Sequence, residues 1–431
     1  MKIYIVGGAV RDKFLKLPII ERDYVVVGAN SSEMLAKGFK KVGKDFPVYL
    51  HPTTKEEYAL ARTEKKIGSG YYGFSCDFNQ SISLEQDLLR RDLTINAMAI
   101  DENEQLIDPY NGLKDLNNKI LRHVSNAFTE DPLRVLRVAR FAARFYYLGF
   151  KVAPETLSLM REIVASNELE YLTKERVWKE LEKSLSERNP EIFIYTLRAC
   201  GALKVLFPEI DRLFGVPAAI KHHREVDTGV HSLMVLSMAA GLSNDPVIRF
   251  AALVHDLGKG VTLMNKWPKH TGHEELGVDI ISSFCDRLSI PNQYRKQAII
   301  AAKLHALVHK SKNLSAEALV NILEVADAFR NSRNFFDLLV VCKADFAGRG
   351  LQAKFANIAW YFPTFAIDLD PYDIKNYTQE DFMRKIYEIC VKIDFKSVDS
   401  NQLNGDEIKL AIHNKRVECV TQYIGMNSDE R

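Results

Sequence analysis

The chain has no cysteine pairing pattern. Its 431 residues include six scattered cysteines without any Cys-x-x-Cys spacing, at Cys76, Cys200, Cys285, Cys342, Cys390 and Cys419. Disulfide-dependent secreted domains instead carry cysteines at regular, closely spaced positions. We therefore expect free thiols and a reducing compartment, the cytoplasm.

Long apolar runs and repeats are also missing. The run from Ile3 to Val10 is interrupted at once by Arg11, Asp12 and Lys13, so it is too short for a signal-peptide core or a membrane span. We expect no membrane partner. Without internal repeats, low-complexity segments or long linkers, the domains should follow one another directly in an elongated arrangement.

Neither sign of charge is in excess. The 58 basic and 56 acidic side chains give a net charge of only +2, which excludes a positive field over the whole surface. Any surface that binds phosphates must therefore be a local cluster of arginines.

What is present indicates a soluble protein of several domains. With 47% hydrophobic and 26% charged residues, a chain of this length should form two or more cores. Eight of the eleven histidines fall between His222 and His309, the sharpest shift in composition. We expect a mixed α/β domain over 1–125, a helical neck over 126–215, a histidine-rich helical domain over 220–350 and a helical tail over 351–431.

Hydrophobic periodicity predicts the elements of the first half. Alternating or continuous β-branched runs predict strands, and spacings of three and four predict helices. The expected strands are Met1–Val6, Asp23–Val27 and Glu57–Arg62, the expected helices are Ala9–Leu17, Asp131–Phe145, Pro154–Ala165, Lys174–Leu185 and Pro190–Val205, and a mobile glycine loop is expected over Gly68–Gly73.

Two features near the N-terminus suit phosphate and metal chemistry. Gly7 and Gly8 stand between a strand and a helix, where backbone N–H groups can approach a phosphate, although a plain tight turn has the same pattern. Glu21 and Asp23 lie two apart at the start of a strand, so alternation places both carboxylates on one face. Such a pair can hold Mg²⁺ for phosphoryl transfer; otherwise the two are solvated edge charges.

Further along, four arginines recur at spacings of three, three and four on an otherwise apolar helix, at Arg134, Arg137, Arg140 and Arg144. Such residues share one helix face. A single row of guanidinium groups on an apolar helix favours anion binding over a solvated surface.

Four ordered segments carry a family resemblance: Gly7–Asp12 with Glu21–Asp23, Arg90–Ala99, Asp108–Gly112 and Glu130–Arg137. They resemble the motifs of the nucleotidyltransferase superfamily that contains bacterial CCA-adding enzymes and poly(A) polymerases. The resemblance implies an α+β, polymerase-β-like head followed by an all-α neck. The family usually has Asp at the first metal position, where this chain has Glu21.

The resemblance implies roles for individual residues. Glu21 and Asp23 would hold Mg²⁺, and Glu64 is a candidate third catalytic carboxylate. The nucleotide would be bound by Gly8, Arg11, Arg91, Asp131, Arg134, Arg137 and Arg140. The implied substrates are ATP, CTP and tRNA, the last held by shape and phosphate contacts, and the protein would be a monomer or homodimer.

Asp131 and Arg134 are implied to select the base. A carboxylate accepts from an exocyclic amine while a guanidinium donates to a ring acceptor, and cytosine and adenine share that polarity. Guanine and uracil present it reversed, so their donors or acceptors would stay unpaired. Asp131 before Pro132 is also a good helix N-cap, and both roles are compatible.

The histidine-rich region resembles the HD-domain phosphohydrolases through His231, His255-Asp256 and Asp345, in that order. The resemblance implies a site for Ni²⁺, Mn²⁺, Co²⁺ or Mg²⁺, with phosphatase and 2′,3′-cyclic phosphodiesterase or 2′-nucleotidase activity. Four more histidines are candidates for a second metal or a substrate phosphate: His270, His273, His305 and His309.

Two other functions fit part of the sequence. A poly(A) polymerase shares the head, but such enzymes typically carry two basic residues after a glycine where this chain has Gly43-Lys44-Asp45, and they carry no HD module. An HD hydrolase whose head only binds RNA conflicts with the complete set of head motifs. We therefore expect template-independent addition of CCA to tRNA.

Overall fold

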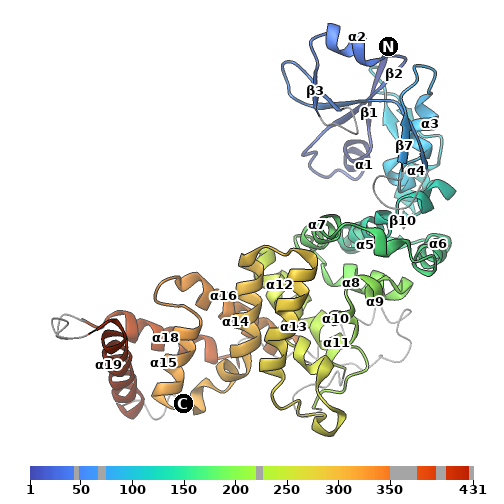
Figure 1. Ribbon diagram of the computed structural model, residues 1–431. Coiled ribbons are helices and arrows are strands. Elements are labelled where there is room, and N and C mark those ends of the chain that lie inside the picture. Colours follow the sequence, from blue (N-terminus) through green and yellow to red (C-terminus); the bar gives the residue numbers. More distant parts are fainter. Residues whose placement is uncertain (43–47, 67–73, 220–226, 350–375, 395–403, 427–431) are drawn as a thin grey trace. The chain divides into compact units, whose positions relative to one another are not determined.

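The computed structural model (Figure 1) describes residues 1–42, 48–66, 74–219, 227–349, 376–394 and 404–426. Within them the chain forms two compact units, Met1–Phe207 and Pro208–Arg431. Each unit has its own candidate site and is described separately.

The first unit contains a seven-stranded mixed sheet in the order β3-β4-β5-β2-β1-β8-β9. Its strands are β1 (Lys2–Val6), β2 (Asp23–Val27), β3 (Lys40–Val42), β4 (Val48–Leu50), β5 (Glu57–Leu60), β8 (Ala99–Ile100) and β9 (Leu106–Ile107). The antiparallel register of β1 and β2 pairs Val6 with Asp23. The Gly7 turn at the end of β1 therefore lies beside the first residue of β2.

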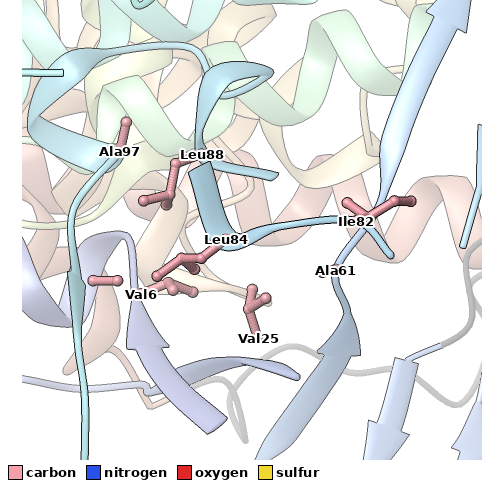
Figure 2. Packing of buried hydrophobic residues seen from close by; sticks show 8 residues of the cluster. Val6, Val25, Ala61, Ile82, Leu84, Leu88 and Ala97 are labelled. Carbon is pink, nitrogen blue, oxygen red and sulfur yellow. The ribbon is translucent and has the colours of Figure 1, made fainter. Parts of the chain in front are cut away.

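The core of this sheet is a cluster of small and branched apolar side chains (Figure 2), contributed by Val6, Val25, Ala61, Ile82, Leu84, Leu88, Ala97 and Ala99. Burying one Val or Leu side chain contributes about 1.5–3 kcal/mol. Helix α3 (Leu84–Leu89) begins with a capping box, in which Ser83 accepts from the amide of Gln86 and Gln86 accepts from the amide of Ser83. The cap and the cluster together hold the segment before Arg90 against the sheet.

The rest of the first unit is mainly helical. Its other helices are α1 (Gly8–Phe14), α2 (Ser31–Ala36), α4 (Gly112–Asn117), α5 (Leu133–Phe145), α6 (Pro154–Ala165), α7 (Lys174–Leu185), α8 (Glu191–Cys200) and α9 (Ala202–Leu206), with two short pairs, β6–β7 (Thr63–Lys66, Phe74–Asp77) and β10–β11 (Ile120–Leu121, Lys151–Val152). Helix α5 packs against both α7 and α8. This packing buries its apolar face and leaves its arginines to meet charged partners.

The second unit is built from helices within the described ranges. They are α10 (Pro208–Asp211), α11 (Thr228–Leu242), α12 (Pro246–Val254), α13 (His273–Leu288), α14 (Asn292–His309), α15 (Ala316–Val325), α16 (Ser332–Gly348), α18 (Gln379–Val391) and α19 (Gly405–Met426). Helices α11, α12, α14 and α16 pack on one another. A Cβ on Gly258 would lie 1.9 Å from the carbonyl oxygen of His273, so only glycine lets the segment after Asp256 approach the start of α13.

The structure confirms the fold class, a sheet-containing first part followed by helices. Strand Asp23–Val27 and helices Pro154–Ala165 and Lys174–Leu185 have the predicted bounds, and α1 and β5 end earlier than predicted. The single helix predicted over Pro190–Val205 is wrong: Gly201, with a φ of 84°, ends α8 and separates it from α9. The predicted loop at Gly68–Gly73 lies outside the described residues.

The five cysteines with described side chains are free, as predicted. Cys76 lies in β7, and its side chain is outside the described part of the chain. Among the described helices, none combines the length and the apolar character that crossing a bilayer requires. The four-domain division stays a prediction.

Candidate active sites

The first unit contains a cavity of about 620 Å³ that is lined by an unusual number of arginines. Its walls are Gly7, Gly8, Arg11, Glu21, Asp23, Arg62, Arg90, Arg91, Asp92, Asn96, Asp131, Leu133, Arg134, Arg137, Arg140, Phe141, Arg144 and Arg176. Nine cationic side chains thus face four carboxylates. A ligand with several negative charges fits this balance.

The glycine turn forms one wall of the cavity. Gly7 has a φ of 70°, which a side chain would strain, and an added Cβ would lie 2.9 Å from Nη1 of Arg91. Its amide donates to the carbonyl oxygen of Met98 at 3.2 Å, so the turn is tied to the second motif. Because α1 has only seven residues, an anion here would be bound by individual N–H groups and arginines more than by a helix dipole.

Glu21 and Asp23 line the same cavity, while Arg22 lies 3.8 Å from Glu56. Strand β2 begins at the predicted residue, Asp23, and Glu21 lies two positions before it. In the described structure neither carboxylate has a hydrogen bond or ion pair, in contrast to Asp92 and Asp131. Partial desolvation raises the pKa of Asp23, with Arg91 opposing the shift and Glu21 adding to it.

A buried polar network connects three elements around the cavity. Nη1 of Arg11 donates to Oδ1 of Asn96 at 2.6 Å, and Nδ2 of Asn96 donates to Oδ1 of Asp92 at 3.0 Å. Nε of Arg137 donates to Oδ2 of Asp92 at 2.7 Å. Arg11 also donates to both carboxylate oxygens of Asp12, at 2.9 and 3.0 Å. The network therefore fixes the guanidinium groups of α1 and α5 before any ligand binds.

The buried carboxylate of Asp92 contributes to the stability of the folded protein in a pH-dependent way. Burial alone would raise its pKa, but the charge of Arg137 and the hydrogen bonds from Asn96 and Arg137 hold the pKa well below the usual range. A lowered folded pKa stabilises the protein above the unfolded value of about 3.9, and the contribution is lost as pH falls through the folded pKa.

We expect Asp92→Asn to lower the free energy of unfolding at pH 7 by about 2 kcal/mol. This is less than for a fully buried pair, because the Arg137 side chain is 36% exposed. Chemical denaturation from pH 7 to pH 3 measures the effect, and the variant should lose less stability on acidification than the parent. Glu102→Gln, at an exposed position of the same unit, is the control; an equal effect of both variants would contradict the assignment.

Asp131 and Arg134 lie together at the start of α5. Oδ1 of Asp131 accepts from the amide of Leu133 at 3.0 Å, and Nη2 of Arg176 donates to Oδ1 and Oδ2 at 3.2 and 2.9 Å. The helix is counted from Leu133, but Pro132 already has helical backbone angles, and Asp131 has an extended backbone and accepts the amide of Leu133, so Asp131 performs the predicted capping role. Arg134 donates to the carbonyl oxygens of Ala127 and Arg90, both at 2.5 Å.

The remaining arginines of the α5 row also have acidic partners. Nε of Arg140 donates to Oε2 of Glu180 at 2.6 Å, with both side chains largely buried. Nη2 of Arg144 donates to Oδ2 of Asp12 at 3.3 Å. The ring of Phe141 lies 4.6 Å from the guanidinium of Arg140. The row predicted from spacing does face the cavity; α7 and α1 supply the partners of Arg140 and Arg144, and the segment around Asp92 supplies partners of Arg134 and Arg137.

Sequence reasoning missed part of this wall. Asn96 and Asp92 lie within the segment Arg90–Ala99, and Arg176 lies in none of the four motifs. The signal for the first two is an Asp and an Asn that follow two arginines within one motif. Glu64 lies in β6 opposite Cys76, and its side chain is outside the described residues.

In the second unit, buried histidines surround two aspartates. Asp345 on α16 contacts Nε2 of His231 at 2.9 Å and Nε2 of His309, and Arg349 donates to it at 3.2 Å. Asp256 lies within 3.3 Å of Nε2 of His255 and of His273, and Nζ of Lys259 donates to it at 2.6 Å. Ligand atoms of His231, His255 and Asp345 lie within 4.8 Å of one another, as do those of His255, Asp256 and His305.

The histidine tautomers fit a metal. Nδ1 of His255 lies 2.8 Å from the carbonyl oxygen of Ala252, and Nδ1 of His273 lies 3.0 Å from that of His270. A carbonyl only accepts, so each Nδ1 carries a proton, and Nε2 is the ring nitrogen that can present a lone pair to a metal. Within the described ranges, Nε2 of both rings and Oδ1 of Asp256 are buried without a hydrogen bond. Converging acceptors of this kind call for a shared cation.

Electrostatics keep the two aspartates ionised. Burial would raise the pKa of Asp256, but Lys259 and His255 hold it well below the usual range. Burial also opposes ionisation of Asp345, and Arg349 with His309 outweighs it, so that pKa is likewise low. Burial lowers the pKa of His309 to about 4, which leaves this imidazole neutral at pH 7.

His270 does not belong to this cluster. Its Nδ1 lies 2.6 Å from Oγ1 of Thr262 and its Nε2 lies 2.8 Å from the carbonyl oxygen of Pro217, so both ring nitrogens are engaged by the protein. The hypothesis that His270 binds metal or phosphate is therefore wrong. Lys259, Arg349 and Tyr377, whose hydroxyl lies 3.2 Å from Nδ1 of His309, border the cluster and were not predicted.

Three family models match the chain in order. Residues 3–122 match the poly A polymerase head domain, residues 149–214 match a probable RNA and SrmB-binding site of polymerase A, and residues 228–332 match the HD domain.

Relatives and solved structures that match nearly the whole chain agree with these family models. The multifunctional CCA protein of Legionella pneumophila (strain Lens) is 51% identical over 420 residues, which is 97% of both chains. The structure of the Bacillus stearothermophilus CCA-adding enzyme in complex with CTP has a TM-score of 0.60 at 22% identity, covering 98% of this chain and 89% of that one. The Thermotoga maritima CCA-adding enzyme complexed with tRNA has a TM-score of 0.53 at 19% identity, covering 96% and 91%.

The head, the helical region that follows and the HD domain define a nucleotidyltransferase with an attached phosphohydrolase-type domain. Identity of this level over nearly the whole length is decisive for its membership. The chain belongs to the family of multifunctional CCA proteins, which are tRNA nucleotidyltransferases.

Proposed function

We propose that this protein adds the terminal CCA to tRNA from CTP and ATP without a template, in the cavity of the first unit. The convergence of the Gly7 turn, the carboxylates of Glu21 and Asp23 and the arginine row on one cavity of about 620 Å³ supports the proposal. The CTP and tRNA in the printed descriptions of the Bacillus and Thermotoga enzymes support the same substrates.

Glu21 and Asp23 would hold Mg²⁺. Carboxylate oxygens are the ligands that Mg²⁺ prefers, and these two face the cavity without an ion pair to any cation in the described part of the chain. The bound ion would lower the pKa of the attacking 3′-hydroxyl and offset charge on the triphosphate. Gly8, Arg11, Arg91, Arg137 and Arg140 would hold the phosphates and ribose, and Glu64 remains a candidate third carboxylate.

Asp131 and Arg134 would read the base. Asp131 is oriented by two donors, and Arg134 makes two short hydrogen bonds to carbonyl oxygens, so neither side chain would need to be ordered at binding. Two fixed groups of opposite polarity match the amine and the ring nitrogen of cytosine and adenine. Guanine and uracil would leave both groups without complementary partners.

We also propose that the HD domain hydrolyses phosphate esters, including 2′,3′-cyclic ends of damaged tRNA. The buried acceptors of His255, Asp256 and His273 support metal binding, and mixed nitrogen and oxygen ligands suit Ni²⁺, Mn²⁺ or Co²⁺ as well as Mg²⁺. Lys259 and Arg349 would bind the phosphate oxygens. Such an activity would prepare a 3′ end for resynthesis.

The alternatives carry less support. A poly(A) polymerase would extend with ATP alone, and the base-reading pair and the HD match favour CCA addition instead. Asp45, which stands where poly(A) polymerases typically carry a basic residue, lies outside the described residues. An HD hydrolase with an inactive head conflicts with the exposure of Glu21 and Asp23 to the same cavity as the arginine row.

Sequencing of the product tests the proposal. A tRNA transcript without its terminal triplet, incubated with protein, Mg²⁺, CTP and ATP, should gain CCA and then stop. An oligo(A) product would instead favour the polymerase alternative. With no extension in any nucleotide mixture, the nucleotidyl transfer site as assigned would be wrong.

A further inference from the structure

Helix α7 (Lys174–Leu185) carries two charged side chains, four residues apart, that hold groups of the cavity. Arg176 donates to both carboxylate oxygens of Asp131, and Glu180 accepts from Nε of Arg140. Residues four apart lie on the same face of a helix. One face of α7 therefore fixes a base-reading group and an arginine of the row.

The contacts of Asp131 define which oxygen faces a ligand. Oδ1 accepts two hydrogen bonds, from the amide of Leu133 at 3.0 Å and from Arg176 at 3.2 Å, while Oδ2 accepts from Arg176 at 2.9 Å. A carboxylate offers about four lone-pair positions, so acceptor capacity remains, mainly on Oδ2. Donors from the first turn of α5 and from α7 together fix the rotation of the carboxylate plane.

Stability alone does not explain the Arg176–Asp131 pair. The two side chains are 26% and 24% exposed, and ion pairs that are partly open to water contribute little to folding. Packing of α7 is already provided by its buried Val177, Trp178 and Leu181. The pair instead lies on the wall of the cavity, where its geometry meets a ligand.

We propose that Arg176 is a specificity-determining positioning residue, which holds Asp131 so that Oδ2 meets the exocyclic amine shared by cytosine and adenine. This inference rests on the proposed function. Uracil and guanine place a carbonyl oxygen at that position, and a fixed carboxylate would repel it. A carboxylate released by loss of Arg176 can rotate away, so it neither attracts the amine nor repels the carbonyl.

The test compares CTP with UTP on full-length protein. A tRNA transcript that lacks CCA is extended under single-turnover conditions with each nucleotide alone, for the parent and for Arg176→Met. We expect kcat/KM for CTP to fall about 10- to 100-fold and that for UTP to change little, so discrimination falls by a similar factor. Arg176→Lys should recover part of the discrimination, because an ammonium can donate to both oxygens.

Two variants on the same helix separate positioning from general damage. Lys179→Met removes an exposed positive charge three positions after Arg176 on the same helix and should leave the CTP-to-UTP ratio unchanged. Glu180→Gln disturbs Arg140 and should slow extension with CTP and with UTP by the same factor. Thermal unfolding and HD-domain hydrolysis show whether each variant is folded.

Equal losses for CTP and UTP in both Arg176 variants would overturn the inference and leave Arg176 a structural residue. In that case the proposed function still stands if the parent prefers CTP. A parent protein that shows no preference for CTP over UTP would instead count against the proposed function itself.

Discussion

Asp23→Ala should reduce addition of C and A to tRNA by at least about 10³-fold while hydrolysis by the HD domain continues. Asp23 and Glu21 face the cavity without a hydrogen bond or ion pair among the described residues, whereas Asp92 and Asp131 there are bound by arginines. Removing a Mg²⁺ ligand forfeits several kcal/mol of transition-state stabilisation, and 1.36 kcal/mol is a factor of ten in rate. Single-turnover extension and calorimetric titration of Mg²⁺ with CTP measure the effect.

Glu85→Ala, which removes an exposed carboxylate of the same unit, is the matched control and should keep near-parental addition. Glu21→Asp restores the residue that the family usually has and should keep substantial activity. If Asp23→Ala still adds a complete triplet at a rate within tenfold of the parent, these carboxylates do not hold the catalytic metal.

His255→Ala should remove metal from the HD cluster and lower phosphate-ester hydrolysis by about 10³-fold, with CCA addition unaffected. Nε2 of His255 faces both Asp256 and the His231–Asp345 pair, so its ring belongs to both candidate ligand groups. Loss of a shared ligand weakens both groups, and metal-assisted hydrolysis depends on the ion to polarise the phosphoryl oxygen and activate water. Metal content by mass spectrometry and turnover of p-nitrophenyl phosphate and 2′,3′-cyclic AMP measure the two effects.

His413→Ala is the matched control, because His413 lies in the same unit but contacts Glu324 at 3.0 Å instead of the cluster. It should retain metal and hydrolysis. A His255→Ala protein that holds as much Ni²⁺ or Mn²⁺ as the parent would show that the cluster is a structural network of histidines and aspartates. Loss of CCA addition in the same variant would show that the two activities are not separable in this chain.

The sequence predicted well those features that depend on neighbours in the chain. Strand Asp23–Val27 is continuous in β-branched and aromatic residues, and helices Pro154–Ala165 and Lys174–Leu185 have apolar residues at helical spacing, so local preference and tertiary packing agree. The helix through Gly201 was predicted wrongly because periodicity outweighed the one residue whose left-handed backbone ends it.

The candidate sites divide in the same way. Spacing alone indicated that Glu21 and Asp23 share a side and that the α5 arginines share a face, and motif order indicated His231, His255, Asp256 and Asp345. The sequence did not indicate that Asn96 hydrogen-bonds both Asp92 and Arg11, which is 85 positions away. It also did not indicate that Arg176 binds Asp131, which is 45 positions away. The clustering of histidines also suggested His270 as a ligand, although its Nε2 is hydrogen-bonded to the carbonyl oxygen of Pro217, 53 positions away.

By itself, then, the sequence determined the kinds of chemistry that the chain can perform: carboxylates and glycines for nucleotidyl transfer, histidines and aspartates for a metal, and a row of arginines for phosphate. These kinds of chemistry depend on residue type and on spacing over a few positions, which can be read from short stretches of the sequence. Only the tertiary structure decided which charges are neutralised and which remain available, because that depends on donors and acceptors brought together from distant parts of the chain. Asp92 and Asp23 illustrate the difference, since one is buried against Arg137 and the other faces the cavity without a partner among the described residues.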